Sequence, residues 1–212
     1  MGPEKIAQVR QVIAHEKANT DETSRLNVWL LERAVRLHHM IELPEGHEFE
    51  TLAAFVLEYV DFLPECLDQF HSVAARAGIS EYTDLFLDIA VDFLLSPPQG
   101  VEHSPGIGHL IDEAFMAHRI LEELNDRCYG YLGGPAMPAD TSYANIVIHS
   151  LIGDAFANEL DLVVQYAIEA NQDKERAVMA KLNRTEVQSL GLAGKEWPLF
   201  GEHSSVAIKF RF

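Results

Sequence analysis

The feature that most constrains the fold is a pair of long amphipathic stretches, residues 107–130 and 141–169, joined by the turn-rich run GYLGGPAMPADT. Within each stretch, apolar residues recur three or four positions apart. An α-helix turns by about 100° per residue, so this spacing places them on one helical face. Glycine and proline in the connecting run end the first helix and reverse the chain. The sequence therefore predicts a central helical hairpin over about 107–169.

The same periodicity predicts further helices on both sides of the hairpin. They cover residues 4–18, 22–42, 48–77, 81–95 and a short stretch within 173–190. Leu43-Pro44 ends the second of these helices, and Pro64 predicts a kink or a restart in the third. Residues 96–109, rich in proline and glycine, are expected to form a loop. We therefore expect an all-α protein in which residues 1–212 form a single-domain helical bundle of about six or seven helices.

The C-terminal arm, about residues 192–212, ends in a different pattern. In its last residues, SSVAIKFRF, apolar side chains alternate with others, and this period of two is typical of a β-strand. One strand alone cannot satisfy its backbone, so it either pairs with another copy of the chain or packs as a short extended arm. Either arrangement favours a homodimer.

Composition and charge exclude several classes of partner. The formal net charge is −17, and no cluster of Lys and Arg offsets it, so binding to nucleic acid or to an anionic membrane surface is not expected. No apolar run approaches the ~20 residues that a membrane span needs. Cys66 and Cys128 lie far apart among apolar neighbours, which favours free thiols in a reducing compartment. We expect an acidic, soluble, cytoplasmic protein.

Several polar side chains fall on helical faces that are otherwise apolar. His118 and Glu113 border the apolar face of 107–130, while His149 and Glu159 interrupt that of 141–169. His38 lies on the apolar face of 22–42. A carboxylate on a core face is unfavourable unless it is paired, protonated or bound to a metal. In contrast, the second hairpin helix carries a polar stripe that we assign to solvent: Asp154, Asn158, Asp161 and Gln165.

One shared ligand would satisfy several of these inward groups at once. The candidate ligand or metal residues are His38, Glu113, His118, Glu122, His149 and Glu159, with Asn27, Asn125, Tyr129 and Tyr166 beside them. The cofactor that this hypothesis implies is a divalent metal such as iron. Its alternative is that each group bonds locally within the core.

Two short spacings are similar to the di-iron ligand pattern of hemerythrin. His118 and Glu122 form His-x-x-x-Glu, and His149 and Asp154 form His-x-x-x-x-Asp. The chain departs from the pattern because hemerythrin needs a His-x-x-x-His between these motifs, and no histidine occurs from 119 to 148. The Glu-x-x-His pairs of ferritin-like di-iron bundles are also missing.

The sequence leaves the function open between two classes. It contains no Gly-x-Ser-x-Gly elbow, Walker loop or dinucleotide fingerprint, so no residue is assigned a catalytic role. We slightly prefer a non-catalytic protein that binds a small molecule or a partner, because this asks for fewer coincidences. The alternative is a metal-binding protein or enzyme with a buried His/carboxylate site.

Overall fold

The architecture is an all-α helical bundle, as the periodicity predicts. The computed structural model describes residues 1–18, 20–96, 107–201 and 208–210, and 74% of these residues are helical. Over these residues the elements are α1 (Pro3–Ala18), α2 (Thr20–Ala34), β1 (Ile41–Glu42), α3 (Glu48–Ala77), α4 (Ser80–Leu95), α5 (Ile107–Leu132), α6 (Ser142–Ile152), α7 (Asp154–Glu169), α8 (Gln172–Met179), α9 (Arg184–Ser189) and β2 (Lys209–Phe210).

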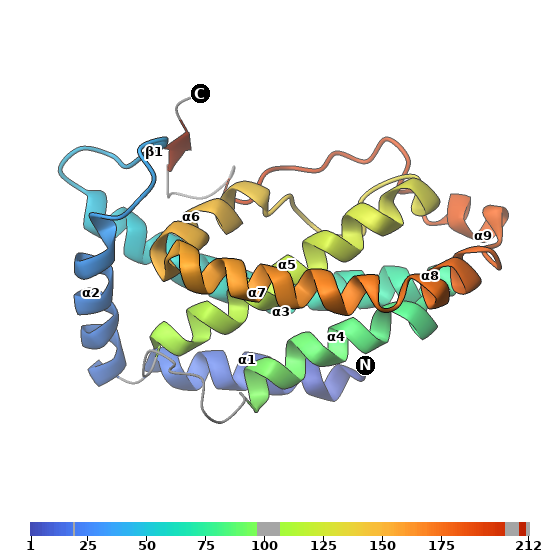
Figure 1. Ribbon diagram of the computed structural model, residues 1–212, viewed down its shortest axis with the longest axis horizontal. Coiled ribbons are helices and arrows are strands. Elements are labelled where there is room, and N and C mark those ends of the chain that lie inside the picture. The colour runs from blue at the N-terminus through green and yellow to red at the C-terminus, as the bar shows by residue number, and fades with distance from the viewer. Residues whose placement is uncertain (19, 97–106, 202–207, 211–212) are drawn as a thin grey trace.

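Helix α5 forms the centre of the bundle. It packs against α3, α4, α6, α7 and α2, and every residue from Leu110 to His118 is buried. This half of α5 is buried on all sides, which explains why its apolar positions extend beyond a single stripe there. In Figure 1, α2 stands across one end of the bundle, and α8 and α9 lie at the opposite end. Buried apolar residues from α1 to α8 form one continuous cluster.

Two predicted helices are divided in the structure. The stretch 141–169 becomes α6 and α7, separated by Gly153, and 173–190 becomes α8 and α9. In the described ranges this raises the number of helices from the expected six or seven to nine. Helix α3 runs through Pro64 without a restart. The loop expected over 96–109 falls largely outside the described residues, and α5 begins at Ile107.

The helix predicted over 22–42 is too long. Helix α2 ends at Ala34, where the tighter bonds from Arg36 N to Arg33 O and from Leu37 N to Ala34 O close its last turn. The chain then turns into β1, which pairs antiparallel with β2. Backbone pairing between distant segments therefore overrides the helical periodicity at this point.

The C-terminal strand pairs within its own chain. Ile41 lies opposite Phe210, and Glu42 lies opposite Lys209. The strand signature is confirmed for 209–210, whereas residues 202–207 and 211–212 of the arm fall outside the described part. A second copy is thus not needed to pair the described strand. Among the described helices, none is both long and apolar enough to cross a membrane.

Candidate functional site

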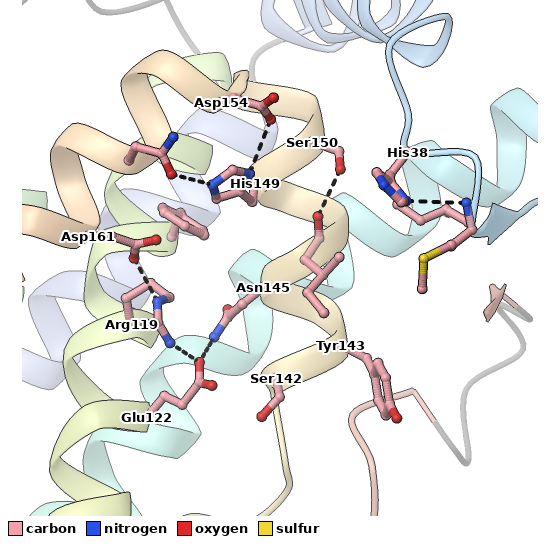
Figure 2. Close-up of a pocket in the computed structure, with 15 residues that line it drawn as sticks. His38, Arg119, Glu122, Ser142, Tyr143, Asn145, His149, Ser150, Asp154 and Asp161 are labelled. Carbon is pink, nitrogen blue, oxygen red and sulfur yellow. Dashed lines mark hydrogen bonds and ion pairs between the residues drawn. The ribbon is translucent and has the colours of Figure 1, made fainter. Parts of the chain in front are cut away.

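A pocket of about 610 Å³ opens between the turn after α2, the middle of α5, and helices α6 and α7. Its apolar lining comes from Met40, Ile41, Phe115 and Ile146. Its polar lining comes from His38 of the turn and from three helices of the predicted hairpin, and it is shown in Figure 2. Pockets of roughly 300–1,000 Å³ with apolar walls and a few fixed polar groups are typical of small-molecule sites.

Gly153 separates α6 from α7, the two helices that line one side of this pocket. Its backbone has φ 96° and ψ 138°, a conformation that side chains with a Cβ rarely adopt. It ends α6 through a bond from its own N–H to the His149 carbonyl, and its carbonyl accepts the first bond of α7 from Ala157. Helix α7 therefore starts in a new direction, and its residues do not continue the face pattern of α6.

This change of direction alters part of the face assignment made over 141–169. Asp154 and Asn158, which we assigned to solvent, are exposed and also line the pocket, whereas Asp161 lines it half-buried. Glu159, which we expected on the core face, is exposed, and so is Tyr166. The buried face of α7 consists of Ala157, Leu160, Val164 and Ile168. The prediction was wrong for Glu159 and Tyr166, because one helical phase was applied across Gly153.

A chain of polar side chains crosses the pocket from α7 through α5 to α6. The Arg119 guanidinium donates through Nε to Asp161 Oδ1 at 2.7 Å and through one of its terminal nitrogens to Glu122 Oε2 at 2.5 Å. Asn145 donates its amide to the same Glu122 oxygen. Burial lowers the pKa of Arg119, but the carboxylates of Glu122 and Asp161 outweigh it and leave this pKa raised. The cation is therefore firmly held between two anions.

The chain continues from Asn145 into the core. The buried Tyr59 hydroxyl donates to Asn145 Oδ1 at 2.6 Å. Burial, together with the negative charge of Glu122, raises the pKa of Tyr59, so its hydroxyl keeps the proton that it donates. Asn145 is thus fixed from both sides, with Tyr59 at its oxygen and Glu122 at its nitrogen. This fixes the amide orientation and rigidifies one wall of the pocket.

His149 lies in the last turn of α6 and faces the first turns of α7. Its Nε2 is 3.2 Å from Asn158 Oδ1, and its Nδ1 is 3.5 Å from Asp154 Oδ1. The edge of the imidazole meets the Phe115 ring at a centroid distance of 6.0 Å. Figure 2 shows this imidazole between the two oxygens. The contacts tie α6 to α7 across Gly153.

The structure brings three of the six candidate ligand residues to the pocket: His38, Glu122 and His149. His38 reaches it from the exposed turn after α2, not from a helix face as predicted, because α2 ends at Ala34. Its Nδ1 accepts a bond from the Met40 N–H at 3.3 Å. The other three candidates lie elsewhere: Glu113 and His118 are buried in α5, and Glu159 is exposed.

The four residues expected beside the ligands are also dispersed. Asn125 is buried and accepts the Ala136 N–H at 2.9 Å, so it holds the connection between α5 and α6. Asn27 is half-buried on α2. Tyr129 and Tyr166 are 46% and 67% exposed, which removes both from the core face where we expected them.

His118 belongs to the core. Its Nε2 is 3.1 Å from the Tyr59 carbonyl oxygen, which can only accept, so Nε2 carries the proton. The Tyr59 ring packs against the imidazole at a centroid distance of 4.2 Å, and Phe62 stacks on it at 6.5 Å. Nδ1, the nitrogen left for a metal, is buried without a hydrogen-bond partner. Burial lowers the pKa of His118 to about 4.

No metal centre is assembled in the part of the chain that the structure describes. No three His, Cys, Asp or Glu side chains gather there in a way that could hold an ion. The hemerythrin-like spacings explain little of the geometry, because His118 contacts the core, Glu122 pairs with Arg119, and Asp154 contacts His149.

The sequence reasoning missed the residues that organise the pocket: Tyr59, Arg119, Asn145 and Asp161. One signal was available, since Arg119 and Glu122 stand three apart on a helix, where opposite charges meet. The partners on α6 and α7 could not be read in the same way, because their positions depend on the turn at Gly153.

The comparisons with known proteins give no family and no relative, so the function is inferred from the site itself. The chain matches no protein-family model, and the searches of curated proteins and of solved structures found no similar one. What the fold and site define is an all-α bundle with a partly apolar pocket beside a fixed polar network.

Proposed function

We propose that the protein binds a small organic molecule, without chemical conversion, in the pocket between the turn 38–41 and helices α5, α6 and α7. The observation that carries this proposal is the combination of an open pocket of about 610 Å³ with a polar wall whose side chains are already hydrogen-bonded to one another. A pre-formed wall does not have to be ordered when the ligand arrives, and this lowers the cost of binding.

The chemistry of the pocket favours binding over catalysis. A nucleophile must be activated by a base within hydrogen-bond reach. Here the Ser150 hydroxyl donates to the Ile146 carbonyl and that of Ser142 to Asp140, so each engages an acceptor other than a histidine. Cys66 and Cys128 are buried, and burial raises the pKa of both thiols. A metal-dependent activity remains a hypothesis that no geometric observation favours.

Filling the pocket with a larger side chain should abolish ligand binding. Ile146 lies on α6, lines the pocket and is 47% exposed, so Ile146→Trp should occupy the space without disturbing the core. Val163→Trp is the matched control, because Val163 on α7 is 51% exposed and lies outside this pocket. A screen of small organic compounds by thermal shift, followed by calorimetry of those that bind, measures the effect. Compounds that bind wild type and Ile146→Trp equally would refute the proposed site.

We also propose a cytoplasmic location and a homodimer, as the sequence suggests. The location is supported by two buried free cysteines, which a reducing compartment preserves. The dimer was inferred from the C-terminal arm, and β2 now gives this arm a second role beside β1, next to the pocket residue Ile41.

Deleting residues 204–212 separates the two roles of the arm. Removing β2 leaves β1 without its partner strand, so the wall formed by residues 38–41 should loosen and ligand affinity should fall by about tenfold, the equivalent of ~1.4 kcal/mol. Molecular mass in solution tests the dimer in the same samples. An unchanged molecular mass would show that the arm is not part of the dimer interface. An unchanged ligand affinity would show that the arm does not support the pocket.

A further inference from the structure

We propose that the ligand of this pocket is an organic cation, a protonated amine carried by an aromatic or branched aliphatic body. This inference rests on the proposed small-molecule function and names the class of ligand. The charged side chains that line the pocket are three carboxylates, Glu122, Asp154 and Asp161, and one guanidinium, Arg119. These four groups together carry an excess of two negative charges.

Arg119 offers little to an anionic ligand. Two of its N–H donors are bonded, Nε to Asp161 and one terminal nitrogen to Glu122, so an anion that used the remaining donors would lie beside two carboxylates that already balance this charge. Such a ligand would also approach a protein whose formal net charge is −17. The field of the protein and the local pairing therefore act in the same direction, against anions and in favour of cations.

The carboxylates that hold Arg119 still offer acceptors to a ligand. Both bonds to Glu122 end on Oε2, and Oε1 takes part in neither of them. The Arg119 bond to Asp161 ends on Oδ1 and leaves Oδ2 out. Both side chains are partly shielded, at 18% and 30% exposed, so their charges are less screened than those on an open surface. An ammonium group has three donors, which suits a site with several acceptor oxygens.

The third carboxylate has a different role. Asp154 is 86% exposed at the side of the pocket that His149 borders. A carboxylate so well solvated adds little to the strength of an ion pair, but it adds to the negative potential that a cation meets on its approach. Glu122 and Asp161 are therefore the residues that we assign to the bound ammonium.

The rest of the pocket selects the body of the ligand. Phe115 lies on α5 with Glu122, and Ile146 lies on α6 with Asn145. Met40 comes from the turn after α2, and Ile41 comes from β1. In Figure 2 the linked side chains of Asp161, Arg119, Glu122 and Asn145 lie on one side of the view, and His38 and Tyr143 lie on the other. An amphipathic amine fits this lining, because the carboxylates suit its cationic end and the apolar side chains suit its body.

The test compares three compounds of similar shape on wild-type protein: 2-phenylethylamine, 2-phenylethanol and 3-phenylpropanoate. We expect the amine to bind about tenfold more tightly than the alcohol, and the carboxylate to bind most weakly, as measured by calorimetry or ligand-observed NMR. Ile146→Trp should weaken the amine and the alcohol alike. Equal affinity of the amine and the alcohol, or tighter binding of the carboxylate, would overturn the inference about the cation.

A pair of variants on one helix provides the second arm. Glu122→Gln should weaken the amine by about tenfold and leave the alcohol unchanged, because only the cation loses an ion pair. Glu123→Gln is the matched control: its carboxylate pairs with Arg127 and does not line this pocket. If the two variants affect the amine equally, the inference fails. Failure of the proposed binding function is distinguishable from this result, because Ile146→Trp would then leave the affinity of all three compounds unchanged.

Discussion

Acidification from pH 7.5 to pH 5 should reduce the free energy of unfolding by about 2 kcal/mol through His118 alone. The imidazole is fully buried, and burial lowers its pKa from the usual value of 6.5 to about 4. Between these two values the unfolded chain takes up a proton at this site and the folded chain does not. The stabilisation is thus complete above pH 6.5 and is lost as the pH falls towards 4.

The environment of His118 explains the size of this effect. Protonation at Nδ1 would create a cation between the rings of Tyr59 and Phe62, where that nitrogen has no hydrogen-bond partner. Nε2 already donates to the Tyr59 carbonyl, so the ring cannot turn to offer Nδ1 a partner without breaking this bond.

Two variants isolate the contribution. His118→Gln removes the titrating group. Between pH 7.5 and pH 5, its unfolding free energy, measured in urea, should therefore fall by about 2 kcal/mol less than that of wild type. Ile120→Val, in the same buried helix, should cost about 1 kcal/mol at both pH values, because it changes packing and not charge. If His118→Gln shows the same pH dependence as wild type, the imidazole is not the group responsible.

The bundle could be predicted from the sequence because its helices are amphipathic or fully apolar over many turns. Helix α3 illustrates this: its predicted range of 48–77 is the observed range, and Pro64 changes neither end. Hydrophobic burial along 30 residues outweighs one lost backbone bond. The predicted hairpin was also found, with α5 as its first helix.

The site could not be predicted in the same way because it depends on two local departures from helical phase. At Gly153 the chain leaves the helix for one residue, so the helical phase of α6 does not predict that Asp161 lies in the pocket and Glu159 in solvent. At Ala34 the helix ends, and β1 forms because β2, almost the whole chain away, lies beside it. A lone glycine in a helical pattern is a weak signal, and a contact between distant segments gives none.

A polar residue on an apolar face was also ambiguous by itself. In the sequence His118 and His149 were both candidate ligands. In the structure His118 is a core residue and His149 lines the pocket. Their difference lies in neighbours that come from other helices: Tyr59 and Phe62 of α3 for His118, and Asp154 and Asn158 of α7 for His149.

Removing the Arg119 guanidinium should reduce stability more than removing any exposed arginine, and it should also change the ligand preference of the pocket. Arg119→Met leaves Glu122 and Asp161 without their cation at positions that are largely shielded from water. Breaking a buried ion pair costs 3–5 kcal/mol, and partial exposure reduces this to about 2 kcal/mol here. Arg176→Met is the control, because Arg176 is 72% exposed and its pair with Asp173 should contribute under about 0.5 kcal/mol.

The double variant Arg119→Met/Glu122→Gln shows whether the loss comes from an uncompensated charge. If it does, removing the second charge should recover about half of the lost stability, since Asp161 alone then remains unpaired. Equal unfolding free energies for Arg119→Met and Arg176→Met, measured in urea, would contradict the assignment of Arg119 as the link between α5 and α7.

Arg119→Met protein that stays folded should bind 2-phenylethylamine more tightly than wild type does, because the ammonium then takes the place of the guanidinium between the same two carboxylates. Weaker amine binding in this variant would mean that Arg119 shapes the pocket and does not compete with its cation.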